Sequence, residues 1–348
     1  MKQGWTYKKL GEVCNIDFGT RVVRSRDAGS VYPVYGGGGA TFKMDTYNRE
    51  DCMVISRFGM SEECTRFVKG KFFLNDSGLT LSMKEKCMIQ PFMDWQILSL
   101  NNTIYSLGRG AAQKNLDTKA LAEVTISYPS LSEQERIVSR LDAAFGEIEG
   151  LKAKAEAQLS EARTLFQAAL TQEMKPKQGW EEKKLGEVAK VIHGKNQKDV
   201  LSENGQYPIY GSGGNIMGYA NDYLCDAGTT ILGRKGSINN PMFIEEPFWN
   251  VDTAFGISAK EGSNSKYLYY FIKSIDWQEK NTGTTLPSLT QQVVKDVEIP
   301  LPPLPVQQQI VSRLDALSEK VRELEEAQKK VIAECDALKQ ALLREVFE

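Results

Sequence analysis

The 348-residue sequence contains a single histidine, His193, and its six cysteines form no C-x-x-C pair. A paired-histidine metal site therefore lacks a residue it needs, and a His–Cys zinc site or a Ser–His–Asp triad would have to be built on His193. We expect His193 to be a structural or surface residue. We expect the cysteines to be free thiols that pack as small apolar side chains in a reducing compartment.

Several other signatures are missing. No run of about 18 apolar residues is present, and the N-terminal stretch "MKQGWTYKKL" has no signal-peptide core. No G-x-x-x-x-G-K-[ST] motif occurs, and the glycine-rich stretches fail the G-x-G-x-x-G spacing. We therefore predict a cytoplasmic protein that does not span a membrane, has no catalytic residues, no metal and no cofactor, and acts by binding.

The net charge is −2, and basic residues outnumber acidic ones only in residues 1–130. Such a balance argues against a protein that holds DNA by bulk electrostatics alone. If the chain binds nucleic acid, we expect partners to supply part of the positive charge.

The sequence does contain a long internal repeat. "KQGWTYKKLGEV" (2–13) returns as "KQGWEEKKLGEV" (177–188), "YPVYGGGG" (32–39) as "YPIYGSGG" (207–214), and "IVSRLDA" (137–143) unchanged at 310–316. The offset stays near 175 throughout, which indicates a tandem duplication with small loop insertions. Each copy mixes short β-branched and aromatic runs with Gly, Asn and Ser turns, and then continues into a long helical pattern.

The repeat predicts an α/β (α+β) fold of four parts with internal pseudo-twofold symmetry. These parts are a first head (1–130), a first spacer helix (131–175), a second head (176–303) and a second spacer helix (304–348). Ser132 and Glu135 have capping-box spacing at the start of the first helix, and Pro305 suits the first turn of the second.

Apolar residues in both helical regions recur at alternating steps of four and three, the pattern of a coiled coil. We expect the two helices to pair antiparallel, as a rod with a head at each end. Gln158 and Gln328 interrupt the apolar pattern and are expected to mark its register. A helix that simply packs on its own head is the alternative. The seam residues we select are Ile137, Leu141, Ile148, Leu151, Leu165, Ile310, Leu314, Val321, Leu324 and Leu338.

The ordered motifs resemble those of the specificity subunit of type I restriction–modification systems. They are "W…KKLGEV" at the start of each head, the two Tyr-Pro-x-Tyr-Gly loops, "SRFG" with "GRKG", and "YPSLSEQERIVSRLD" with "PLPPLPVQQQIVSRLD". The resemblance covers nearly the whole chain. It implies two target-recognition domains that each read half of a bipartite double-stranded DNA site. It further implies that the helices dock two methyltransferase subunits, and that translocase–nuclease subunits join for restriction.

The DNA-binding candidates lie in the glycine-rich loops and beside the basic residues that follow a β-rich stretch. Glycine lets backbone N–H groups approach phosphate, and Arg or Lys binds phosphate or guanine edges. The predicted DNA-binding residues are Gly36, Gly37, Gly38, Arg57, Arg109, Lys114, Gly211, Ser212, Gly213, Arg234, Lys235 and Thr284.

Two other functions stay open. The first is an interaction scaffold whose heads bind ligands but have no DNA role. The second is an enzyme, such as a DNA methyltransferase fused to a reader, although the missing cofactor loop argues against it.

Overall fold

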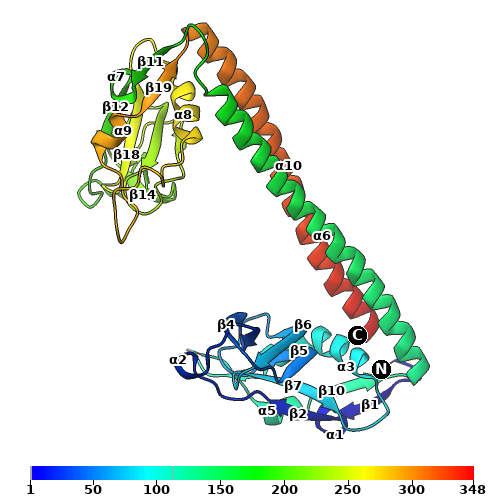
Figure 1. Cartoon of the computed structure of the whole chain (residues 1–348). Helices are drawn as coiled ribbons and strands as arrows, with labels where there is room; N and C mark the ends of the chain where they lie inside the picture. Colours follow the sequence, from blue (N-terminus) through cyan, green and yellow to red (C-terminus); the bar gives the residue numbers. More distant parts are fainter. Residues whose placement is uncertain (1, 112) are drawn as a thin grey trace. The chain divides into compact units, whose positions relative to one another are not determined.

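Two long helices, α6 (Leu131–Glu173) and α10 (Leu304–Phe347), each follow a head of short strands and helices (Figure 1). The computed structural model of the chain describes residues 2–111 and 113–348. The chain divides into unit 1, which comprises the residues up to Ala155 together with Lys330–Glu348, and unit 2, which comprises Glu156–Lys329. Each unit contains one head, part of α6 and part of α10. Across the described ranges, no helix combines the length and the apolarity needed to cross a membrane.

The first head is organised around a six-stranded sheet with the order β2-β7-β5-β6-β3-β4. Neighbouring strands are antiparallel except for β3 and β6, which run parallel. The elements are β1 (Thr6–Lys9), α1 (Leu10–Val13), β2 (Cys14–Phe18), α2 (Arg24–Asp27), β3 (Tyr32–Tyr35), β4 (Ala40–Met44), β5 (Arg49–Ser56), β6 (Thr65–Leu74), β7 (Gly78–Met83), α3 (Gln90–Ser99), α4 (Asn101–Ser106), β8 (Gly108–Arg109), β9 (Asn115–Leu116), α5 (Thr118–Ala122) and β10 (Thr125–Tyr128).

The second head has the same succession of main strands, with a shorter β15 in place of β5 and the two short strands β16 and β17 in place of β6. A four-stranded sheet, β12-β18-β15-β16, lies beside a three-stranded sheet, β14-β13-β17. The elements are β11 (Glu181–Lys184), α7 (Leu185–Val188), β12 (Ala189–His193), β13 (Tyr207–Tyr210), β14 (Ile216–Ala220), β15 (Thr229–Gly233), β16 (Met242–Ile244), β17 (Trp249–Asn250), β18 (Ala254–Ala259), α8 (Ser265–Ser274), α9 (Gln291–Lys295) and β19 (Glu298–Leu301).

The two heads share individual hydrogen bonds as well as element order. The first strand of each head pairs antiparallel with its last strand, β1 with β10 and β11 with β19. Lys84 donates from its Nζ to the Gly11 carbonyl at 2.7 Å, and Lys260 donates in the same way to Gly186 at 2.7 Å. The duplication predicted from the motifs is therefore a duplication of structure.

One buried glutamine attaches each long helix to its head. Gln134 Oε1 accepts from the Ile89 N–H at 2.9 Å, and Gln307 Oε1 accepts from the Asn264 N–H at 2.8 Å. Because α6 already begins at Leu131, Ser132 lies inside its first turn and is not the N-cap that its spacing from Glu135 predicted. Pro305 is the second residue of α10, in the first turn as expected.

An aspartate on each helix makes a second attachment. Trp95 donates from Nε1 to Asp142 at 2.9 Å, and the Tyr270 hydroxyl donates to Asp315 at 2.6 Å. Asp142 and Asp315 are the aspartates of the two "IVSRLDA" motifs, which lie 173 positions apart. Each helix is therefore held to its own head by one amide and one carboxylate.

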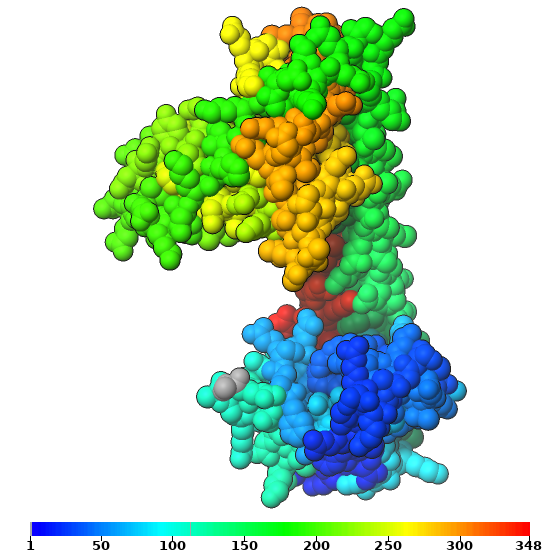
Figure 2. Space-filling model, turned by 60° about the vertical axis from the view of Figure 1, so that its left-hand side comes forward, coloured from blue at the N-terminus to red at the C-terminus, as the bar shows by residue number. Residues whose placement is uncertain are grey.

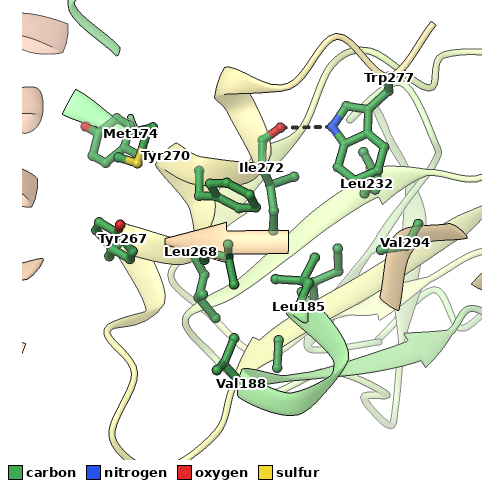
Figure 3. Packing of buried hydrophobic residues seen from close by; sticks show 14 of the residues in the cluster. Met174, Leu185, Val188, Leu232, Tyr267, Leu268, Tyr270, Ile272, Trp277 and Val294 are labelled. Carbon is green, nitrogen blue, oxygen red and sulfur yellow. Dashed lines mark hydrogen bonds between the residues drawn. The ribbon is translucent and has the colours of Figure 1, made fainter. Parts of the chain in front are cut away.

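The hydrophobic core of each head also extends into the helices. In the second head, α8 and Trp277 pack over α7, and Trp277 donates to the Ile272 carbonyl at 2.9 Å (Figure 3). Leu170 of α6 and Met174, the residue that follows α6, belong to the same cluster. In unit 1, the equivalent end of α10 lies against the first head (Figure 2), where the Phe347 ring centre is 5.4 Å from that of Phe92.

Within each unit, α6 and α10 run antiparallel and exchange polar contacts. In unit 1, Lys152 Nζ lies 3.0 Å from Asp336 Oδ1, and Lys339 forms an ion pair with Glu149. In unit 2, Arg163 Nε lies 2.7 Å from Glu325. Gln328 Nε2 donates to Gln158 Oε1 at 2.9 Å, so the two glutamines expected to mark the register bind each other.

The seam between the helices departs from the predicted pattern at three leucines. Leu151, Leu165 and Leu338 are 53%, 61% and 49% exposed, so the prediction that they lie in the seam is wrong. Of the other residues selected, Ile137, Leu141, Ile148, Ile310 and Leu314 are buried, and Val321 and Leu324 are half-buried.

The reason is a change of step. After Ile148 the seam of α6 passes through Lys152 and Ala155, then through Leu159, Ala162 and Phe166. The prediction took a step of three after Ile148, whereas the structure takes a step of four, so Lys152 and Phe166 replace Leu151 and Leu165 while Ala155 keeps its place. The long side chain of Lys152 takes the place predicted for Leu151, with its aliphatic stem over the seam and its ammonium on Asp336.

All six cysteines, every one in the described part of the chain, carry free thiols. Cys14, Cys64, Cys225 and Cys335 are buried. Burial raises the pKa of the Cys14 and Cys225 thiols to about 12. These four cysteines therefore pack as small apolar side chains, as predicted from the sequence.

Candidate nucleic-acid interface

Five separate segments of the first head meet around Arg57. The end of β2 joins the turn before β7 through Gly19 N–H to the Gly78 carbonyl at 3.0 Å. The same turn holds the loop after β3, through Asn75 N–H to the Tyr35 carbonyl at 2.8 Å. Arg57 itself bridges two segments. Its N–H donates to the Ser77 carbonyl at 2.8 Å, and its carbonyl accepts from the Leu116 N–H at 2.8 Å.

The second head builds the same junction around Arg234. Gly194 N–H donates to the Ala254 carbonyl at 3.0 Å, and Val251 N–H to the Tyr210 carbonyl at 3.2 Å. Arg234 N–H donates to the Thr253 carbonyl at 2.8 Å, and its carbonyl accepts from the Leu289 N–H at 2.9 Å. Arg57 and Arg234 therefore occupy equivalent backbone positions.

A glycine is needed in each junction where two backbones touch. A Cβ on Gly19 would lie 1.9 Å from the Asn75 carbonyl oxygen, and a Cβ on Gly194 would lie 1.8 Å from that of Val251. Real Cβ atoms never come so close to backbone oxygen. The end of β2 and the end of β12 are thereby held directly against the turn that supports the arginine.

The glycine-rich loop of the first head is partly buried. A Cβ on Gly37 would lie 2.5 Å from the Phe58 carbonyl oxygen, and one on Gly36 would lie 2.6 Å from Asn75 Oδ1. Gly38 is exposed, with open space where a Cβ would be. Close packing therefore accounts for Gly36 and Gly37, and solvent reaches the loop at Gly38.

The corresponding loop of the second head behaves similarly. Gly211 is buried, Ser212 is half-buried and Gly213 is exposed. Gly211 N–H donates to the Asn215 carbonyl at 3.0 Å, and Gly214 N–H donates to the Gly211 carbonyl at 3.0 Å. Two of the loop's N–H groups are therefore used inside the loop, which leaves Ser212 and Gly213 as its accessible part.

Arg57 lies between two aromatic rings. Its guanidinium carbon is 4.7 Å from the ring centre of Phe18 and 4.5 Å from that of Phe58, in cation–π contact with both. Phe18 is 47% exposed and Phe58 is 38% exposed. The rings fix the direction of the guanidinium, which is half-buried, and surround it with an exposed apolar rim.

Arg234 has different neighbours at the same places. His193 ends β12 where Phe18 ends β2, and Lys235 follows Arg234 where Phe58 follows Arg57. Arg234 Nη1 donates to the Asp252 carbonyl at 3.1 Å, as Arg57 Nη1 donates to the Asp76 carbonyl at a longer 3.5 Å. The second junction is therefore cationic and polar where the first is aromatic.

His193 belongs to this junction. Its ring meets Phe255 edge-on, with ring centres 4.9 Å apart. Partial burial lowers the pKa of His193, and the charges of Arg234 and Lys295 lower it further. His193 is exposed, in agreement with the expectation of a structural or surface residue, but its place beside Arg234 was not predicted, and Phe18 and Phe58 were not selected from the sequence. An alignment of the two copies would have pointed to these residues. Phe18 aligns with His193, and Phe58 aligns with Lys235, which follows Arg234.

The remaining predicted residues lie in the segment that precedes α5 or α9. Phe58 bridges to Asn115 and Lys235 bridges to Ser288, so this segment lies next to the arginine in both heads. Arg109 forms an ion pair with Asp117, whose carboxylate also caps α5. The Lys114 ammonium lies 3.8 Å from the ring centre of Tyr105. Thr284, on the equivalent loop of the second head, is exposed.

The chemistry available at both junctions is that of a binding surface. Guanidinium and ammonium groups donate hydrogen bonds to phosphate oxygens and to the acceptor edges of bases. Exposed rings stack on bases or contact methyl groups. In the described residues, no group of three or more His, Cys, Asp or Glu side chains is arranged to hold a metal ion.

Comparison with known proteins identifies related chains. The family model for the type I restriction modification DNA specificity domain matches twice, at residues 2–160 and 177–334. A putative type I specificity subunit of Mycoplasma pneumoniae is 23% identical over 336 residues, covering 90% of this chain and 88% of the relative. A putative type I restriction enzyme specificity subunit of Haemophilus influenzae is 29% identical over 142 residues, and the match spans only 37% of that relative's length.

Solved structures share the fold. A chain from a study of complex assembly and conformational transition of the type I R-M system has a TM-score of 0.75 at 17% identity, with 99% of this chain and 97% of that chain covered. The HsdS subunit of Thermoanaerobacter tengcongensis has a TM-score of 0.51 at 17% identity, with 100% and 97% covered.

Proposed function

The chain belongs to the type I restriction modification DNA specificity family, and we propose that each of its two heads reads one half of a bipartite duplex DNA target. Two copies of the family domain cover most of the sequence, one for each head. A scaffold with no DNA role, the alternative left open by the sequence, is not supported by this membership. The head boundaries at 130 and 303 are part of the proposal.

The observation that carries the proposal is the duplicated junction around Arg57 and Arg234. The two junctions share their backbone hydrogen bonds and differ in the side chains that surround the arginine. Two heads that bind different base sequences need the same backbone frame and different exposed side chains. The backbone frame fixes the geometry of the contact, and the exposed side chains select the bases. In this scheme the basic and polar residues selected from the sequence are the contacts nearest the DNA.

The helices supply the proposed docking surface for two methyltransferase subunits. Leu165 and Leu338 are 173 positions apart, at equivalent points of α6 and α10, and both are exposed. Figure 2 shows a side of α6 that no other part of the chain covers in that view. Two equivalent apolar positions suit two copies of one partner. Translocase–nuclease subunits would join this assembly for restriction, in the cytoplasm where the DNA lies, and the chain itself would contribute no catalysis.

Alanine replacement of each arginine tests the proposal. The full chain is co-expressed with its methyltransferase subunits, the methylated motif is read by sequencing, and duplexes are prepared with either half-site scrambled. Arg57→Ala should lose about 1–3 kcal/mol of affinity through one half-site only, and Arg234→Ala through the other. Lys8→Ala serves as the control, because Lys8 lies on β1 in an exposed ion pair with Glu85. Equal binding by all four proteins, or equal losses at both half-sites, would contradict the proposal.

A further inference from the structure

Phe18 and His193 occupy one position of the repeated fold. Each is the last residue of its strand, β2 or β12, and pairs across the sheet with Leu79 or Phe255 respectively. Each precedes the glycine whose backbone touches the turn below the arginine. Both side chains are exposed. The position therefore has the same backbone setting in both heads but carries a titratable group in only one.

The charges around His193 are mainly positive. The charged groups on the elements around it are Arg234 and Lys235 after β15, Lys295 of α9, Asp252 in the turn before β18 and Lys195 of the following loop. Arg234 and Lys295 act on the imidazole directly, and together with burial they lower its pKa. The free second head therefore holds His193 as a neutral imidazole near pH 7.5.

DNA would reverse this balance. A phosphate close to Arg234 places negative charge beside the imidazole, and an opposite charge within a few ångströms favours the protonated form. The imidazolium has two N–H donors and suits a phosphate oxygen, whereas the ring of Phe18 can only make apolar contact at the same place.

Building on the proposed function of the two heads, we propose that His193 is a phosphate contact that takes up a proton when the second head binds its half-site. The first head makes no such proton-linked contact, because Phe18 stands at the equivalent position. His193 thus makes the affinity of the complex for the second half-site depend on pH. Phe18 has no titratable group, so it adds no pH dependence to the affinity for the first half-site.

The sign follows from linkage. Because DNA raises the pKa of His193 above its value in the free head, binding is strongest below the free-state pKa and weakens as pH rises through the bound-state pKa. One imidazole carries one proton, so log Kd changes by at most about one per pH unit. The total gain is about 10-fold for each unit by which DNA raises the pKa.

The test uses the full chain in complex with its methyltransferase subunits and duplexes that carry the methylated motif. Binding is measured from about pH 5.5 to pH 8 for the wild type, for His193→Phe and for the reciprocal Phe18→His. Other titrating groups in the complex are common to all three proteins, so the differences between their profiles isolate position 18 or 193.

His193→Phe should make the affinity for the intact target less dependent on pH than that of the wild type. When the second half-site is scrambled, the two proteins should have the same pH dependence. Phe18→His should introduce a new pH dependence that requires the first half-site. Identical profiles for wild type and His193→Phe, on a target that both bind selectively, would overturn the proposal. If Arg234→Ala retains full affinity for the second half-site, the proposed function of the head fails instead, so the two failures are distinguishable.

Discussion

Replacing Ile148 by aspartate should open the helix pair in unit 1, whereas the same replacement at Leu151 should be tolerated. The two residues lie three positions apart in α6, but Ile148 is 4% exposed and Leu151 is 53% exposed. The helix propensity of the incoming residue is the same in both variants. The difference between them therefore measures burial in the seam alone.

The magnitudes follow from that burial. Removing the buried Ile148 side chain forfeits about 2–3 kcal/mol of apolar burial, and an unpaired carboxylate in its place adds about 1–3 kcal/mol or more. At Leu151 the carboxylate reaches water, so the loss is limited to helix propensity and about half of the apolar contact, about 1–2 kcal/mol in total.

Hydrogen exchange of peptides from α6 and from the end of α10 is the appropriate assay. A chain with two units need not unfold in one step, so a single melting temperature would mix their contributions. Ile148→Asp should accelerate exchange strongly in both helices of unit 1, and Leu151→Asp should accelerate it much less. Equal acceleration by the two variants, or a larger effect at Leu151, would refute the assignment of the seam.

Two further predictions concern the first head. Gly37→Ala should destabilise this head by about 1–3 kcal/mol, because the new Cβ meets the Phe58 carbonyl oxygen. Gly38→Ala is the control and should change stability by less than about 0.5 kcal/mol. Denaturant unfolding of the two variants measures both effects. Burial raises the pKa of Asp94 to about 6, so the folded head binds this proton more tightly than the unfolded chain does, and its stability should fall as pH rises from about 4 to 6. Asp94→Asn should remove this slope and be more stable above pH 6 by up to about 3 kcal/mol, and an identical pH profile in wild type and variant would contradict the shift.

The duplication and the two helices could be predicted because repeated motifs and helical periodicity are local properties of a sequence. In α6 the seam could be predicted only as far as Ile148, whereas in α10 the prediction holds as far as Leu324. After Ile148, the heptad pattern favours Leu151 for the seam because it is apolar, and leaves out Lys152 because it is charged. In the structure the aliphatic stem of Lys152 covers apolar surface while its ammonium pairs with Asp336. Which residue turns inward depends on the pitch of the real helix, which no short motif records.

For a similar reason, the sequence alone pointed to only some of the residues in the candidate site. Arg57 and Arg234 follow recognisable repeated motifs, so they could be selected in advance. Phe18 and His193 join them only because β2 and β12 are brought beside the turns before β7 and β18 by sheet pairing. Contacts between strands that lie about 60 residues apart in the chain leave no local signal. The burial of Gly36 and Gly37 was likewise invisible in a run of four glycines.

The methylated motif of cells that express this chain with its methyltransferase subunits is the most direct test of the central claim. Single-molecule sequencing of the host DNA should return a bipartite motif, two specified half-sites separated by unspecified bases. Replacing residues 1–130 by the first head of a relative should change one half-site and leave the other intact. A continuous motif, or a change in both half-sites after this exchange, would contradict the account of two independent readers.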